Sequence, residues 1–223
     1  MTINLLPRFL HEYYEIHEWR HACAILQTDF PSELRDIIEV LSGFRLYRSY
    51  IDVGGGNKSK VSGSLDSSFY SRGWVEKSFD TKVVIDETEL DSPTHNVDCF
   101  KNRVALEVEW NNKDPFFDRD LNNFRLLFDL RAISVGVIIT RCDELQTIFK
   151  SLGRGSSYGM ATTHMSKLLP RIEGGSGGGC PLLVFGISPH LYVDAEAPIS
   201  NEASAIIGTL YDVTESGEGT DSE

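Results

Sequence analysis

The chain of 223 residues lacks the features that mark secreted and membrane proteins. It has no run of about 18 apolar residues, so we expect no membrane-spanning helix. Its first residues show neither the basic stretch and apolar core nor the cleavage site of a signal peptide. The four cysteines are scattered and form no CxxC pair, which argues against a disulfide framework and a zinc site. We therefore expect a cytoplasmic protein with reduced, mostly buried thiols and no membrane partner.

Positive charge is missing from the C-terminal part of the chain. No Lys or Arg follows Arg171, whereas eight acids follow residue 190. The net charge of −12 argues against a nucleic-acid binder, because phosphate contacts require basic side chains. Without those eight acids, however, 25 acids face 21 bases, a balance of −4. The acidity is concentrated towards a tail, 213–223, that we expect to be disordered, and it does not exclude a basic cleft elsewhere.

The hydrophobic pattern predicts a mixed α/β fold with a central sheet flanked by helices. A broad apolar stripe predicts a helix over 9–27, and a second helix is expected from Pro31 to near Gly43. The continuous apolar run from Ile133 to Thr140 is typical of a strand buried on both faces. Strand, helix and buried strand in succession indicate some parallel pairing. The remaining strands are expected at 45–53, 79–85, 97–100, 104–110 and 181–187, and the remaining helices at 65–73, 118–131, 143–152 and 158–170.

One strand carries two acids on a single face. From Val104 to Trp110 the chain alternates, so that Glu107 and Glu109 share the face opposite the apolar side chains, roughly 7 Å apart. Burying both acids without a partner is costly, and like charges at that distance resist joint ionisation. A divalent cation held between them, with Asp98 on a third side, removes both problems. All-oxygen ligation suits Mg²⁺. The alternative is a half-exposed strand with a solvated acidic face.

A competing motif lies near the N-terminus. His17-Glu18-Trp19-Arg20-His21 is a literal HExxH on a predicted helix, a spacing that places two imidazoles on one face for Zn²⁺ in zinc peptidases. Only 16 residues precede the motif, too few for an upstream substrate-binding sheet, and no third histidine follows at the metzincin spacing. The neighbouring aromatic residues favour a core or interface element instead.

The stretch from Val97 to Glu109 resembles the active-site hairpin of BglII/BstYI-type (BamHI-like) type II restriction endonucleases. These enzymes belong to the PD-(D/E)XK nuclease superfamily, whose pattern is an acid followed by a strand that bears (D/E)-x-K. Glu109 stands where most of the superfamily has Lys, a departure that BamHI-like relatives share. The resemblance spans about residues 74–190 and continues in the segments Asn111-Asn112, Pro115-Phe116, Ser156-Ser157-Tyr158 and 181–187.

The resemblance implies a restriction-endonuclease-like core and assigns roles to the acids. Asp98 and Glu107 are expected to bind Mg²⁺, with the Val108 carbonyl as a further ligand. Glu109 is expected to orient or deprotonate the attacking water. BamHI-like sites often include a further upstream acid, for which Glu76 is the positional candidate, although a surface position is its alternative.

The resemblance also implies a DNA-binding surface and a homodimer. Asn111 and Asn112 follow the catalytic strand, where the family places residues that contact bases; an ordinary turn is the alternative. Arg154, with Ser156 and Ser157, lies in a second candidate loop, and an arginine can bind guanine O6 and N7 with two hydrogen bonds. We expect residues 1–212 to form one catalytic and DNA-binding domain that cuts double-stranded DNA at a palindrome, for which the resemblance implies a GATC core. The alternatives are a non-catalytic DNA-binding relative and the zinc peptidase.

Overall fold

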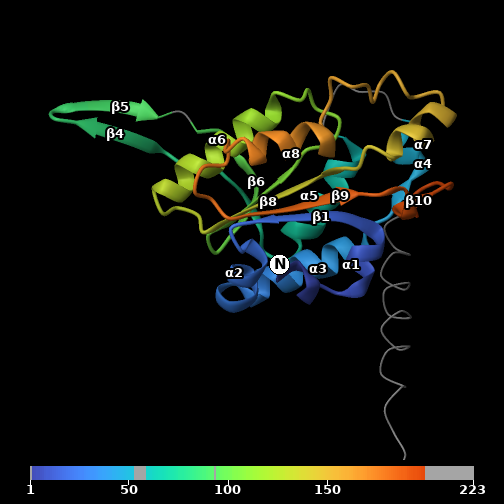
Figure 1. Ribbon diagram of the computed structural model, residues 1–223, viewed down its shortest axis with the longest axis horizontal. Coiled ribbons are helices and arrows are strands. Elements are labelled where there is room, and N and C mark those ends of the chain that lie inside the picture. The colour runs from blue at the N-terminus through green and yellow to red at the C-terminus, as the bar shows by residue number, and fades with distance from the viewer. Residues whose placement is uncertain (1, 53–58, 93, 199–223) are drawn as a thin grey trace, which may run out of the picture.

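A six-stranded sheet organises the chain, which a computed structural model describes over residues 2–52, 59–92 and 94–198 (Figure 1). The strand order is β1-β9-β8-β7-β6-β3. The predicted single domain, 1–212, extends past these residues, and the predicted tail at 213–223 lies outside them. The strands of this sheet are β1 (Tyr14–Trp19), β3 (Val75–Lys77), β6 (Val97–Lys101), β7 (Val104–Val108), β8 (Val135–Arg141) and β9 (Leu182–Ile187).

The middle of the sheet is parallel and its flanks are antiparallel. β7 pairs with β8, and β8 with β9, in parallel, whereas β6 runs antiparallel to β7 and β1 antiparallel to β9. Every residue of β7, β8 and β9 is buried. Helices on both faces exclude water from these strands, which explains their nearly continuous apolar sequences. The predicted mixed α/β class is confirmed.

Two layers of helices cover the two faces of the sheet (Figure 1). One apolar core lies between the sheet and the N-terminal helices, and a second lies between the sheet and two later helices. The N-terminal layer contains α1 (Arg8–Tyr13), α2 (Ala22–Asp29), α3 (Pro31–Gly43) and α5 (Lys60–Tyr70). The opposite layer contains α6 (Phe116–Asp129) and α8 (Met165–Glu173).

Short elements complete the fold. The hairpin of β4 (Thr81–Ile85) and β5 (Thr88–Ser92) extends away from the body of the domain (Figure 1). Among the described residues, no helix is both long and apolar enough to cross a membrane. The other elements are η1 (Thr2–Leu5), β2 (Leu46–Tyr47), α4 (Arg48–Ile51), α7 (Leu145–Ser151), η2 (Pro189–Leu191) and β10 (Tyr192–Val193).

The predicted helix over 9–27 is wrong. Its middle forms the edge strand β1, in which Tyr14 pairs with Ile187 and Trp19 with Leu182. Arg20 and His21 adopt left-handed backbone conformations, with φ of 54° and 60°, which turn the chain into α2. Over a short stretch, an apolar stripe at helical spacing also fits the alternation of a strand. Pairing with the exposed edge of β9 then favours the strand over the helix.

Other predicted boundaries shift for local reasons. Only β2 forms within the strand predicted at 45–53, because the chain enters α4 at Arg48. The helix predicted at 65–73 begins earlier, since the Ser59 hydroxyl accepts a hydrogen bond from Ser62 N and caps α5. The helix predicted at 158–170 begins only at Met165. The predictions for 118–131, 133–140 and 181–187 are confirmed to within a few residues as α6, β8 and β9.

A pair of glycine substitutions tests the packing of α6 on the sheet. A Cβ at Gly136 in β8 would lie 2.6 Å from the buried Phe124 ring and 2.9 Å from Leu182. Gly136→Ala should therefore lower the free energy of unfolding by about 1–3 kcal/mol in urea denaturation. Gly63→Ala is the matched control, because a Cβ there meets nothing within 4 Å in helix α5. It should leave stability unchanged or raise it by about 0.4–1 kcal/mol; equal effects at both positions would contradict this packing.

Candidate active site

The β6–β7 hairpin brings two of the predicted acids together. Cys99 pairs with Leu106 and Phe100 with Ala105, and continuing this register places Asp98 opposite Glu107. The hairpin can be this tight because Asn102 and Arg103 both have positive φ, 45° and 70°, as the shortest β-hairpin turns require.

Hydrogen bonds hold this pair of acids in place. The Asp98 amide lies 3.4 Å from Glu107 Oε2, and Asp98 Oδ2 accepts a hydrogen bond of 3.2 Å from the Val108 amide. The Val108 side chain packs in the opposite core, so only the backbone of this residue belongs to the site.

Both acids of the β7 face are buried. Glu107 and Glu109 each expose 1% of their surface, so the alternative of a solvated acidic face is wrong. The predicted alternation holds, because Leu106 and Val108 belong to the core on the N-terminal helix side and Ala105 to the core on the α6 side. The acids therefore project beneath α6, where burial weakens the screening of their charges by water.

Two residues that sequence reasoning missed complete this buried group. Asp120, on α6, is fully buried, and His95, just before β6, is about one-fifth exposed. His95 Nε2 lies 3.1 Å from Asp120 Oδ1 and 3.4 Å from Glu107 Oε1, but neither approach has hydrogen-bond geometry. Asp120 lies on the apolar stripe of α6, four residues before Phe124. A charged residue on the buried face of a helix could have been recognised in the sequence as a candidate site residue. Nothing in the sequence pattern marked His95.

Burial keeps the carboxyls of Glu107 and Glu109 poorly ionised in the absence of a cation. Burial, together with the charges of Asp120 and Asp98, raises the pKa of Glu107 well above its usual range. Burial and the Asp120 carboxylate raise the pKa of Glu109 to about 9. Among the described residues, Glu107 Oε1 and Asp120 Oδ2 are buried and accept no hydrogen bond. A divalent cation would satisfy such orphaned oxygens, so the residues present fit a divalent metal ion.

Glu109 is held between an amide and a guanidinium. Asn112 Nδ2 donates a hydrogen bond of 2.8 Å to Glu109 Oε2, and Arg119 Nη2 lies 3.5 Å from Glu109 Oε1. The same guanidinium donates at 2.9 Å to Asp120 Oδ1 and lies over the Phe116 ring. The Arg119 side chain is 43% exposed, so it can also meet an anion from solvent. A cavity of about 210 Å³ opens beside it and is lined by Thr94, His95, Arg119, Asn122, Asn123 and Leu126.

The segment after β7 is paired with the segment before α8. Asn112 N donates to Thr163 Oγ1 at 3.1 Å, and Thr163 N donates to the Asn112 carbonyl at 2.8 Å. Asn111 has a left-handed backbone, with φ of 59°, and its buried Oδ1 accepts no hydrogen bond within the described residues. The two predicted DNA-binding asparagines thus lie at a turn that is fixed to a second loop. Asn112 also contacts the candidate catalytic residue Glu109.

A buried arginine anchors the loop that carries the other predicted DNA contacts. Arg141, 1% exposed at the end of β8, donates to the Tyr158 carbonyl at 3.2 Å and to Thr162 Oγ1 at 2.8 Å. Burial lowers the pKa of Arg141 to about 10, so it remains a cation at neutral pH. Within this loop Ser156 and Ser157 are exposed, and Arg154 is partly buried. The three side chains therefore lie on a loop whose base is fixed.

The other predicted acid, Glu76, lies apart from the buried carboxyls. It is exposed on β3, and its Oε1 accepts a hydrogen bond of 2.9 Å from Asn96 Nδ2. Asn96 neighbours His95 in the sequence, so Glu76 is close to the hairpin without entering the cluster. Its catalytic role stays a prediction.

The helix on which the zinc-peptidase alternative depends does not exist. His17 lies within strand β1, where its Nε2 is 2.8 Å from Glu15 Oε1, and His21 lies in the left-handed turn that follows. Glu18 accepts hydrogen bonds from the amides of Thr2 and Cys23, at 3.1 and 3.0 Å. The motif therefore ties the N-terminal segment to β1 and offers no pair of imidazoles on a helix face.

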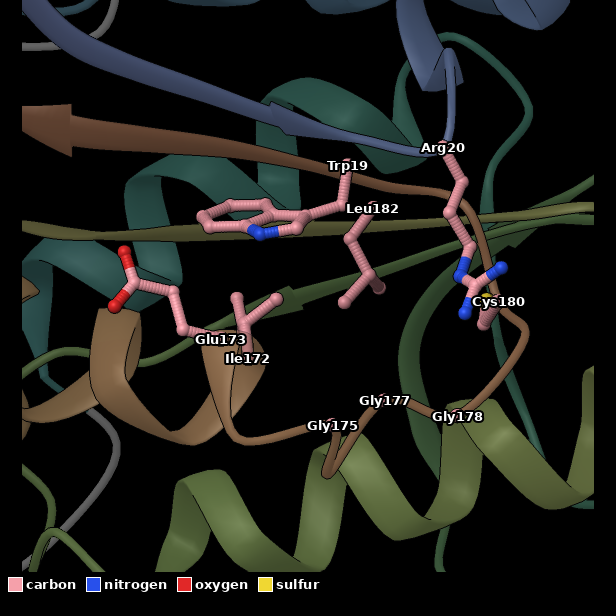
Figure 2. A pocket seen from close by; sticks show the side chains of 9 residues that line it. All are labelled: Trp19, Arg20, Ile172, Glu173, Gly175, Gly177, Gly178, Cys180 and Leu182. Atoms are coloured by element: carbon pink, nitrogen blue, oxygen red, sulfur yellow. The ribbon is translucent and has the colours of Figure 1, made fainter.

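A second cavity, of about 470 Å³, lies at the other end of the parallel strands (Figure 2). Trp19, Ile172 and Leu182 face it, and the glycine-rich loop 174–179 borders it (Figure 2). A Cβ at Gly177 would lie 2.7 Å from Leu182, so the loop packs closely against the start of β9.

Comparison with known families gives one match. The model of the family described as "Restriction endonuclease BglII/BglIII" matches residues 14–187. The match runs from β1 to β9 and includes the β6–β7 hairpin, α6 and the loop before α8. It begins well before residue 74, where the resemblance seen in the sequence began. The search of curated proteins gave no match.

The metal-free protein should become less stable as the pH rises. On folding, the pKa of Glu109 rises from 4.5 to about 9 and that of Glu107 also rises. The unfolded chain therefore loses these protons first, so the stability present below about pH 4.5 is lost progressively towards pH 9. In chelator at pH 8, Glu107→Gln should raise the free energy of unfolding by about 1–3 kcal/mol and flatten this dependence.

The measurement is urea denaturation at several pH values in chelator. Glu87→Gln, at an exposed position in the β4–β5 hairpin, is the matched control and should leave the pH dependence unchanged. If Glu107→Gln is as pH-sensitive and as stable as the wild type, ionisation of the Glu107 carboxyl does not lower the stability of the protein.

Proposed function

The chain belongs to the restriction endonuclease BglII/BglIII family, and from this membership we propose that it is a type II deoxyribonuclease that cuts double-stranded DNA at a palindrome. The observation that carries the proposal is the register of the β6–β7 hairpin, which sets Asp98 opposite Glu107 beneath α6, with Glu109 two residues further on. Buried acids without partners are costly for a protein that has no use for them. In a metal-dependent hydrolase, the bound cation would be the partner of these acids.

Asp98 and Glu107, with the Val108 carbonyl, would hold Mg²⁺. When bound, the ion supplies positive charge to the scissile phosphate and lowers the pKa of a coordinated water. Glu109 would orient the attacking water and accept its proton. Asn112 holds one oxygen of Glu109, which leaves the other oxygen, on the Arg119 side, for this task. Positive charge nearby favours the ionised form of a carboxyl, so a loaded site provides Glu109 as a base.

Arg119 is placed to bind the phosphate that is cut. It is half exposed at the mouth of the site, and contacts with Asp120 and Phe116 orient its guanidinium. Fixed donors aimed at a developing negative charge stabilise a transition state. The anionic charge of the buried acids would otherwise repel DNA, so a cation at this position also helps the backbone to approach.

DNA reading is assigned to two linked segments. Asn111 and Asn112 follow β7, while Arg154, Ser156 and Ser157 lie on the loop whose base Arg141 anchors. Hydrogen bonds between Asn112 and Thr163 join the two segments. A palindrome with a GATC core would be read by a homodimer, since the two-fold symmetry of the site mirrors that of the protein. A DNA-binding relative without turnover is the alternative, and the retained acids argue against it.

Cleavage of plasmid DNA tests the proposal. With Mg²⁺ the protein should cut at one palindrome, and chelator should abolish the cuts; sequencing the fragment ends identifies the site. Glu107→Ala should reduce the cleavage rate by about 10³-fold, because the loss of a metal ligand removes the electrostatic stabilisation of the reaction. Glu87→Gln should cut as the wild type does. Binding of the palindrome without any cleavage by the wild type would favour the non-catalytic alternative.

Arg154→Ala tests the reading of bases, in a Glu107→Ala background that cannot cleave. Binding to the palindrome, measured by fluorescence anisotropy, should weaken by about 1–3 kcal/mol, and preference over an altered site should fall. The control is Arg8→Ala, at an exposed position in α1. A uniform loss on all sequences, with a salt slope smaller by about 1, would instead identify a phosphate contact.

A further inference from the structure

The buried cluster contains more ligands than one cation site needs. His95, Glu107 and Asp120 each offer one ligand atom, and these three atoms lie within 4.8 Å of one another. Two of these residues, His95 and Asp120, have no role in the arrangement of Asp98, Glu107 and the Val108 carbonyl. His95 comes from the segment before β6, and Asp120 comes from α6.

The two oxygens of Glu107 face different neighbours. Oε2 lies 3.4 Å from the amide of Asp98, whereas Oε1 lies 3.4 Å from His95 Nε2. A carboxylate in this orientation can bridge two cations, with one oxygen directed to each. We therefore distinguish an Asp98 side and a His95 side of Glu107.

Buried polar atoms without hydrogen-bond partners lie in the residues that form the His95 position. Glu107 and Asp120 are 1% and 0% exposed, and Glu107 Oε1, Asp120 Oδ2 and His95 Nε2 are buried atoms without a hydrogen-bond partner within the described residues. The Asp120 oxygen that lies 3.1 Å from His95 Nε2, Oδ1, also accepts hydrogen bonds from Arg119. Asn123, also on α6, directs its Nδ2 to the His95 carbonyl at 3.3 Å and so fixes the histidine backbone. The cavity beside His95 and Arg119 gives an ion access from solvent.

We propose that His95, Glu107 and Asp120 form a second cation position, which shares Glu107 with the first and takes a divalent ion that accepts an imidazole ligand. Mg²⁺ and Ca²⁺ prefer oxygen donors only, whereas first-row transition ions bind imidazole readily. Mn²⁺ accepts both carboxylate and imidazole, so the His95 position selects Mn²⁺ over Mg²⁺. This inference rests on the proposed function only in that the two positions share Glu107.

Pulsed electron paramagnetic resonance of Mn²⁺ added to the metal-free full-length protein tests the proposal. A directly bound imidazole adds ¹⁴N modulation to the Mn²⁺ signal, and carboxylate or water ligands do not. The wild type should show this modulation and should bind two Mn²⁺ per chain. His95→Gln should lose the modulation, and the affinity for one of the two ions should fall by about tenfold or more, as at other metal sites that lose a supporting group.

Two variants serve as controls. Asp98→Asn should keep the ¹⁴N modulation, because the His95 position does not use Asp98, and His11→Ala, at an exposed position in α1, should behave as the wild type. Wild-type protein that binds Mn²⁺ without ¹⁴N modulation would overturn the proposal, and His95 would then be only a counter-charge for the acids. Modulation that survives in His95→Gln would overturn it as well.

The outcome is distinguishable from failure of the proposed nuclease activity. Cleavage of DNA in Mg²⁺ by a protein that lacks the Mn²⁺–imidazole signal would refute the second position and leave the nuclease intact. The imidazole signal in a protein that cuts no DNA would support the second position and refute the nuclease.

Discussion

Asp98 and Glu107 face each other across an antiparallel strand pair and under a helix, and the arrangement of the site follows from this constraint. Two like charges in opposed positions repel, and burial beneath α6 weakens their screening by water. Asp120 adds a third carboxylate from α6 itself. The partly exposed guanidinium of Arg119 contacts this group of acids through Asp120 Oδ1. The surrounding structure holds these acids together at a cost in stability, and a bound cation reverses the cost.

The end of β8 supports both Glu109 and the loop proposed to contact DNA. Thr140 Oγ1 donates to the Glu109 carbonyl at 2.9 Å, and the next residue, Arg141, holds the segment before α8. Asn112 joins the same two regions from the other side. The base proposed to activate water and the loop proposed to contact DNA are therefore fixed to one buried strand. Sites placed on rigid elements keep their geometry better than sites on free loops.

The parts of the site that follow a local pattern were predictable from the sequence. The alternation of β7, the spacing of Asp98 and Glu107, and the buried run of β8 depend on residues close in the chain, and the structure confirms them. The family was identified from the same segment. The edge strand β1 was missed because its pairing with β9 depends on residues more than 160 positions away. His95 and Asp120 meet only when α6 docks on the hairpin, and no local pattern encodes that contact.

The electrostatic repulsion between these acids differs before and after α6 docks on the hairpin. The β6–β7 hairpin closes over a two-residue turn, and its acids stay hydrated while α6 is undocked, so their repulsion costs little at that stage. Docking of α6 removes the water and adds Asp120, so the electrostatic penalty falls on this late step. An ion that binds only after docking stabilises the native state without stabilising the hairpin, and it therefore slows unfolding more than it speeds folding. A metal ion held by these acids would therefore keep α6 docked on the sheet for longer.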